Sequence, residues 1–115
     1  MTALSDSHNT DGCNPNSSKY VLIEDCTIHT GDDSIAIKSG KSNEGRSLAI
    51  PSEDIVIRNS EINRFAIGTE MSGGVRNIFV ENLTVGADGI PYWPGQAILI
   101  KSNRDRGGYI EEVYI

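Results

Sequence analysis

Three aspartates have the side-chain type and the spacing for acid–base chemistry. Asp11 lies in an Asn-Thr-Asp-Gly segment, and Asp32 and Asp33 follow Gly31 side by side. Hydrolysis of a glycosidic bond needs two carboxyl groups, one to protonate the leaving oxygen and one to activate a water. Like charges this close raise at least one pKa, which keeps a carboxyl group protonated near neutral pH. A calcium site or turn-forming aspartates are the alternative interpretations of the same residues.

The elements that carry these aspartates must bring them together. Asp11 and Asp32 are 21 residues apart, and a short strand pattern follows each cluster. On neighbouring rungs of stacked strands, about 4.8 Å apart, all three carboxylates share one patch of a sheet face. Side chains on adjacent rungs can leave the gap of roughly 6.5–9.5 Å that an inverting glycosidase needs for its water.

A repeated pattern of alternating apolar and polar residues runs through the chain. Copies aligned on Ile23, Ile57, Val80 and Val113 follow one another after 34, 23 and 33 residues. A second type of strand lies between them, at residues 34–39, 65–70 and 96–102. A repeat that keeps its strands and varies its connections is typical of a solenoid. A β-sandwich also has short strands and frequent turns, but it does not explain the repeat.

The composition and the repeat together predict an all-β parallel β-helix. Ile and Val outnumber Leu by about four to one, and no stretch shows a convincing helical period. We expect about three to four coils without a helix, in an incomplete solenoid. Asp25, Asn59 and Asn82 recur at the corner of the repeat, where Asn tolerates a left-handed backbone and can bond to the next coil. The four aligned apolar residues are expected to stack in one core column.

Length and charge limit the function classes. The chain has 115 residues, which predicts one partial β-helix domain over residues 1–115, and its net charge is −6. That charge argues against a general nucleic-acid binder. The sequence contains neither a run of about 18 apolar residues nor a signal-peptide core at its start, so we predict no membrane span. Cys13 and Cys26 lack the spacing of a metal or redox site and are expected to be free or joined in one bridge. A solenoid this short exposes its end rungs, so we expect a fragment of a longer protein.

Five stretches of the chain follow one another in the order of a known family: residues 9–16, 23–26, 29–40, 67–77 and 100–108. Through these stretches the chain resembles the polygalacturonases, glycoside hydrolase family 28, which are right-handed parallel β-helices that hydrolyse pectin. The Gly-Thr-Glu-Met-Ser-Gly-Gly stretch is similar to the bacterial and plant branch, which includes exo-acting members. The resemblance implies a right-handed β-helix that needs neither a metal nor a cofactor.

The resemblance also implies a role for individual residues. Asp32 is expected to be the general acid, while Asp11 and Asp33 position and activate the water as bases. Lys101 matches the lysine of the family's Arg-Ile-Lys motif and is expected to bind a galacturonate carboxylate as a point charge.

The sequence departs from the family pattern at two places. Leu99 replaces the arginine of Arg-Ile-Lys, so a two-point grip on a carboxylate is missing. The Gly-His-Gly motif expected directly before Phe65 is also missing, because the chain reads Ile-Asn-Arg there. His29 is expected to be a corner residue rather than a substitute for that histidine. Lys38, Arg104 and Arg106 follow the strands that carry the aspartates and can offset their charge, or serve solubility alone. Tyr92 and Trp93 lie on the longest insertion, where their rings pack the loop or stack on a sugar.

By resemblance, the expected activity is inverting hydrolysis of the α-1,4 glycosidic bonds of polygalacturonic acid. The alternative is a catalytically inactive β-helix fragment that at most binds pectic polyanions; a third interpretation is a related pectic backbone such as rhamnogalacturonan. The expected partner is a pectic polysaccharide or an oligogalacturonide, with no nucleic acid and no membrane. We expect a monomer whose uncapped ends allow association, in a secreted or periplasmic location.

Overall fold

The computed structural model describes residues 1–2, 7–86 and 97–115. Within these ranges the chain forms eight strands and one short helix. They are β1 (Lys19–Glu24), β2 (Thr27–Ile28), β3 (Ile35–Ile37), α1 (Ser42–Leu48), β4 (Ser52–Ile62), β5 (Phe65–Ile67), β6 (Val75–Val85), β7 (Ile98–Ile100) and β8 (Ile110–Tyr114).

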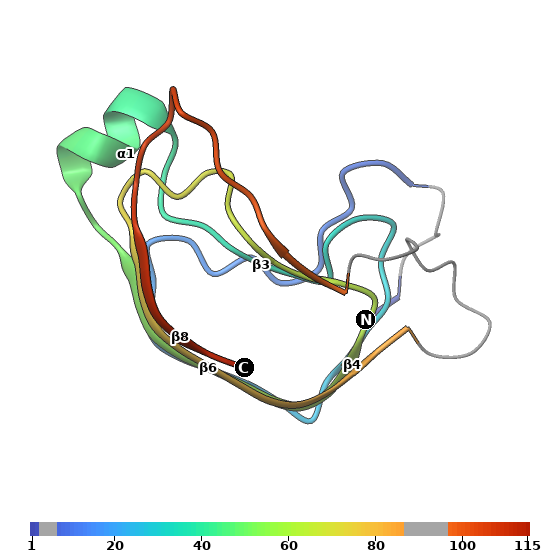
Figure 1. The fold of residues 1–115 in the computed structure, drawn as a ribbon. Helices are drawn as coiled ribbons and strands as arrows, with labels where there is room; N and C mark the ends of the chain where they lie inside the picture. Colours follow the sequence, from blue (N-terminus) through green and yellow to red (C-terminus); the bar gives the residue numbers. More distant parts are fainter. Residues whose placement is uncertain (3–6, 87–96) are drawn as a thin grey trace.

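The strands form two parallel sheets that wind around one core. The longer sheet has the order β1-β4-β6-β8, with β2 also paired to β4, and the shorter sheet has the order β3-β5-β7. Every pairing between these strands is parallel. Figure 1 shows β4, β6 and β8 following one curve, with β3 on the opposite side of the core. The predicted parallel β-helix is therefore confirmed.

The prediction that four apolar residues stack in one column is correct for three of them. Ile23 pairs in register with Ile57, and Ile57 with Val80. Val113 pairs with Ile78 instead, so the prediction that it stacks on Val80 is wrong by two residues. A shift of two residues leaves an alternating pattern unchanged and keeps every side chain on its face. The fourth copy also stops short of the corner asparagine that fixes the alignment of the other three.

Two columns of left-handed residues turn the long sheet at its corners. Asp25, Asn59 and Asn82 have φ values of 54°, 50° and 49°, as the sequence predicted for this corner. The Asn82 amide donates to Asn59 Oδ1 at 2.9 Å, which links adjacent coils. A second column of residues with positive φ lies near the start of β1, β4, β6 and β8. Its members have φ between 53° and 59°, and each comes directly before a residue that is paired in register with an adjacent coil: Tyr20, Asp54, Asn77 and Glu112.

The core lies between the two sheets and consists mostly of isoleucine. Ile35 and Ile37 of the short sheet and Ile55 and Ile57 of the long sheet are fully buried. β-branched side chains of this kind suit a pleated surface that is buried on one face. Both cysteines are free and pack against this core, which agrees with the expectation for isolated thiols. The described residues contain no helix that is long and apolar enough to cross a membrane.

The helix α1 corrects the expectation of an all-strand repeat. It lies in the connection between β3 and β4 and projects outside the coil (Figure 1). Its seven residues are too few to show a helical period in the sequence. The helix ends at Leu48 and is capped by Ala49, whose φ is 50° and whose N–H donates to Gly45 O at 3.0 Å. Gly45 allows the helix to pack closely against the backbone of Gly40, because a Cβ at position 45 would lie 2.7 Å from Gly40 C.

Candidate active site

The short sheet places the three aspartates on neighbouring rungs. Cys13 pairs with Ile35 in parallel, and the Gly12 N–H donates to Asp33 O at 3.0 Å. This register sets Asp11 beside Asp33, as the sequence spacing predicted. A Cβ at Gly12 would lie 2.4 Å from Ser34 O, so glycine is what allows the two segments to approach this closely.

The aspartates line a cleft of about 300 Å³. The cleft is open to solvent and contains acidic, basic and neutral polar side chains. The lining residues are Asn9, Asp11, Asp32, Asp33, Lys38, Gly68, Thr69, Glu70, Lys101 and Arg106.

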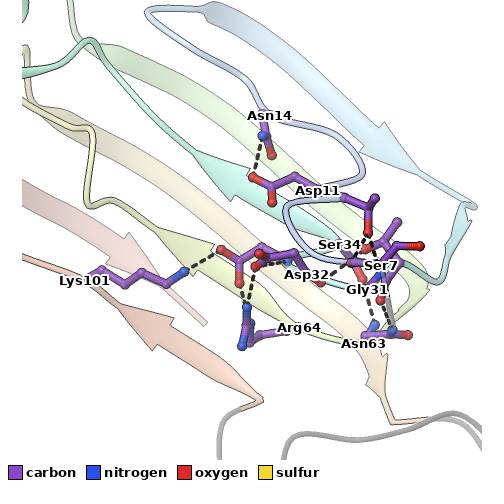
Figure 2. A network of polar contacts seen from close by, with 12 residues as sticks. Ser7, Asp11, Asn14, Gly31, Asp32, Ser34, Asn63, Arg64 and Lys101 are labelled. Carbon is purple, nitrogen blue, oxygen red and sulfur yellow. Dashed lines mark hydrogen bonds and ion pairs between the residues drawn. The ribbon is translucent and has the colours of Figure 1, made fainter. Parts of the chain in front are cut away.

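Arg64 joins the two adjacent aspartates. Its Nη2 donates to Asp32 Oδ1 at 2.7 Å, and its Nε donates to Asp33 Oδ1. Asp32 Oδ1 also accepts the Asp33 backbone N–H at 2.8 Å. Figure 2 shows the Arg64 side chain directed at this pair from the β5 side of the sheet. One guanidinium thus fixes the relative orientation of both carboxylates.

Asp33 is a buried ion that two cations compensate. Its side chain is 4% exposed, and its Oδ2 accepts a hydrogen bond from Lys101 Nζ at 2.6 Å. Arg64, the second cation, is 9% exposed at its side chain. A buried carboxylate is tolerated when it is paired and hydrogen-bonded in this way.

Asp11 is held by a separate set of contacts. Lys38 Nζ lies 3.0 Å from its Oδ2, and Asn14 Nδ2 donates to the same oxygen at 2.7 Å. Partial burial raises the pKa of Asp11, but the hydrogen bonds from Lys38 and Asn14 and the charges of Lys38 and Lys101 outweigh it. The pKa of Asp11 therefore lies below its ordinary value of 3.8, and the group is ionised at neutral pH.

Hydrogen bonds from neighbouring loops fix the turn that carries Asp32 and Asp33. The Thr10 hydroxyl accepts from Gly31 N at 3.1 Å and donates to Ser7 O at 2.8 Å. The Asn63 side-chain amide donates to Thr30 O at 2.7 Å, and the Asn63 backbone N–H donates to the Ser34 hydroxyl at 2.9 Å. These contacts, several of which appear in Figure 2, join three consecutive connections of the coil.

The other predicted site residues are placed as follows. Lys38 and Lys101 line the cleft and bind Asp11 and Asp33, whereas Arg104 is exposed and lies outside the set of lining residues. Strand alternation sets Leu99 on the same sheet face as Lys101, in register with Ala66. His29 lies away from the cleft, with Nε2 2.9 Å from Glu61 Oε1. Tyr92 and Trp93 lie outside the described residues.

Arg64 is the site residue that sequence reasoning missed. Asn63 and Arg64 occupy the last two positions of the expected Gly-His-Gly motif. The motif's histidine is missing at this place, yet Arg64 makes two of the contacts that hold the carboxylates. The signal was present, because a lone arginine directly before a buried Phe-Ala-Ile strand needs an acidic partner.

The arrangement has the groups for acid–base hydrolysis. Asp32 and Asp33 sit side by side, and Asp11 faces them from the next rung. Among the residues that the structure describes, no group of three or more His, Cys, Asp and Glu side chains is placed to hold a metal ion.

Comparison with known proteins gives consistent similarities. The sequence model of the Glycosyl hydrolases family 28 matches residues 1–89. A "Probable polygalacturonase" from Vitis vinifera is 37% identical over 114 residues, covering 95% of this chain and 22% of that protein. An "Endo-polygalacturonase" from Pectobacterium carotovorum subsp. carotovorum is 36% identical over 110 residues, covering 95% of this chain and 25% of its own length.

A solved structure supports the same similarity. The crystal structure of a hyperthermoactive exopolygalacturonase from Thermotoga maritima superposes with a TM-score of 0.78 at 42% identity. The match covers 90% of this chain and 23% of that protein. The chain thus spans about a quarter, or slightly less, of the length of the proteins it resembles.

Proposed function

The chain belongs to the Glycosyl hydrolases family 28, and from this premise we propose that it carries the catalytic carboxylates for hydrolysis of polygalacturonic acid. The bond cleaved is the α-1,4 glycosidic bond, and the mechanism is inverting. The substrate is a pectic polysaccharide or an oligogalacturonide, which implies a secreted or periplasmic site of action. The observation that carries the proposal is the meeting of Asp11, Asp32 and Asp33 in one open cleft.

Asp32 is the general acid in this proposal. The hydrogen bonds that Arg64 and the Asp33 N–H donate both end at its Oδ1, so Oδ2 is the oxygen that carries the proton. The Asp32 side chain is 29% exposed, which gives the leaving oxygen of a bound sugar access to that proton. Transfer of the proton to the glycosidic oxygen breaks its bond to the anomeric carbon.

Asp11 and Asp33 act on the water. Asp11 is ionised because its pKa lies below the ordinary value, so it can accept a proton from the attacking water. Asp33 is held rigidly by two cations and orients that water from the neighbouring rung. Attack from the face opposite the leaving group inverts the anomeric configuration.

A second candidate function is binding of pectic polyanions without catalysis. Arg64 favours it, because a guanidinium has only donors and occupies an oxygen of the expected acid. Lys101 favours it as well, since its ammonium is bound to Asp33 while Leu99 offers no charge to a sugar carboxylate.

A reducing-sugar assay on polygalacturonate separates the two functions. The 115-residue chain is compared with Asp32→Asn and with Asp25→Asn as a matched control. Asp25 is an exposed corner residue whose equivalents in the next two coils are Asn59 and Asn82, so asparagine fits there. Loss of general acid catalysis lowers turnover by about 10²–10⁴-fold.

The expected result is a rate for the unaltered chain that Asp25→Asn keeps and Asp32→Asn loses. Product observed by proton NMR in the first minutes should have the inverted anomeric configuration. An Asp32→Asn protein that turns over at the parent rate refutes the assigned acid. Binding of polygalacturonate without any release of reducing ends establishes the second function instead.

A further inference from the structure

The cations of the cleft differ in what they bind. Lys38 donates to Asp11, and Lys101 donates to Asp33. Arg106 also lines the cleft, but its described side-chain contact is neutral, from Nη1 to the Thr69 hydroxyl at 2.7 Å. Within the described part of the chain, Arg106 is the lining cation without a described ion pair to a carboxylate.

The backbone of Arg106 is fixed independently of its side chain. Its carbonyl oxygen accepts from the Ser72 hydroxyl at 2.7 Å and from Arg46 Nη1 at 2.6 Å. Its N–H donates to Asn103 O at 3.1 Å and closes the turn. Gly108, two residues further along the chain, packs closely on the preceding coil, since a Cβ there would lie 2.1 Å from Met71 O. The guanidinium therefore starts from a rigid turn, which lowers the entropy cost of binding a ligand.

The guanidinium keeps most of its donors for a ligand. A guanidinium has five N–H donors in a planar fork, of which the contact with Thr69 uses one. Glu70, another carboxylate of the lining, has Lys41 as its described ion-pair partner, with 4.0 Å between Lys41 Nζ and Glu70 Oε1. A planar carboxylate matches the remaining donors in a two-point arrangement that an ammonium group cannot reproduce.

We propose that Arg106 binds a carboxylate of the anionic sugar chain, the contact that Leu99 cannot make. The inference rests on the proposed pectic substrate and adds a specificity residue to it. Arg106 lies in the turn that follows β7, the strand that contains Leu99, and it lines the same cleft as Lys101.

Calorimetric titration with trigalacturonic acid tests the proposal. Every protein carries Asp32→Asn so that the ligand is not hydrolysed. Arg106→Gln removes the charge, and Arg104→Gln removes the same charge from an exposed position in the same turn. The trimethyl ester of the trimer is titrated in parallel, because it has the same sugar chain without carboxylates.

The expected effect of Arg106→Gln is a loss of affinity for the acid of about 10- to 150-fold, as for a charge-assisted hydrogen bond. Arg104→Gln should stay within about twofold of the parent, and the ester should show no difference between the Arg106 forms. Thr69→Val provides a second variant, which keeps the charge but removes the hydroxyl that orients it, and should weaken binding by about 2- to 10-fold.

Three results overturn the inference in distinguishable ways. Equal affinities of Arg106→Gln and Arg104→Gln for the acid refute the role of Arg106 and leave the proposed function intact. An equal loss for the ester shows that the change acts on something other than a carboxylate. Absence of binding of either ligand to every form, the parent included, overturns the pectic substrate together with the role of Arg106.

Discussion

Replacing Arg64 by methionine removes the guanidinium that bridges Asp32 and Asp33 and keeps an unbranched side chain of similar length. Asp33 is the aspartate most affected, because its side chain is 4% exposed and retains Lys101 as its remaining cation. The change therefore leaves the buried Asp33 carboxylate with one of its two cationic partners. We expect Arg64→Met to destabilise the coil strongly.

The magnitude follows from the burial of the pair. Breaking a buried ion pair by removing one partner costs about 3–5 kcal/mol, because the remaining charge is left without a partner. Lys101 Nζ, 2.6 Å from Asp33 Oδ2, still offsets part of that cost. We therefore expect Arg64→Met to lower the free energy of unfolding by about 3 kcal/mol, the lower end of that range. For a chain of this length the melting temperature falls by about 10 °C.

Urea unfolding followed by far-UV circular dichroism measures the change. Arg58→Met is the matched control, since Arg58 binds Glu24 at 2.6 Å on the exposed outer face of the long sheet. An exposed pair of this kind contributes little, so its midpoint should stay close to that of the parent. In an Asp33→Asn background the cost of Arg64→Met should shrink by at least about 1 kcal/mol. Equal costs in both backgrounds would show that Arg64 stabilises the fold through something other than Asp33.

Two further predictions concern the cleft. Leu99→Arg restores a two-point donor on the sheet face of Lys101 and should tighten trigalacturonate binding by about 10- to 150-fold; equal affinities in calorimetry would mean that position 99 does not reach the substrate. The lowered pKa of Asp11 makes its ionised form stabilising above the ordinary value of 3.8, and this contribution is lost as the pH falls through the lower folded value. The unfolding midpoint of Asp11→Asn should consequently fall less between about pH 5 and pH 3 than that of the parent, and parallel pH curves would contradict the assigned contacts.

The fold was predictable because each copy of the repeat has the same alternation of apolar and polar side chains. Alternating isoleucine and valine fixed which residues face the core, and the corner residues Asn59 and Asn82 fixed where the sheet turns. Register is harder, since alternation has a period of two and tolerates a slip of two residues. Val113 was misplaced for this reason, in the one copy without its corner residue. The helix α1 escaped prediction because seven residues carry too little periodicity.

The carboxylates of the site were predictable, whereas their cations were predictable only in part. Asp11 and Asp33 fall beside each other because their spacing equals one coil of the short sheet. The cationic partners of those carboxylates lie 27 or more residues away in the sequence, so their distances depend on loop conformation that no local pattern encodes. Arg64 shows this most clearly, because comparison with a motif marks a missing histidine there, while the structure shows two hydrogen bonds to the aspartates.

The design of the coil explains how charge can be redistributed without disturbing the fold. In the short sheet each strand keeps three paired residues, and Ile35, Phe65 and Ile98 remain in register although the connections between them differ in length. The core therefore constrains the strands, while the residues just before and after them supply the charged side chains of the cleft. An arginine absent from position 99 and present at position 106 changes the geometry of the cation and leaves the stacked strands intact. For this reason the chemistry of the cleft has to be tested at the ends of the strands, where Arg64 and Arg106 lie, as well as at the aspartates themselves.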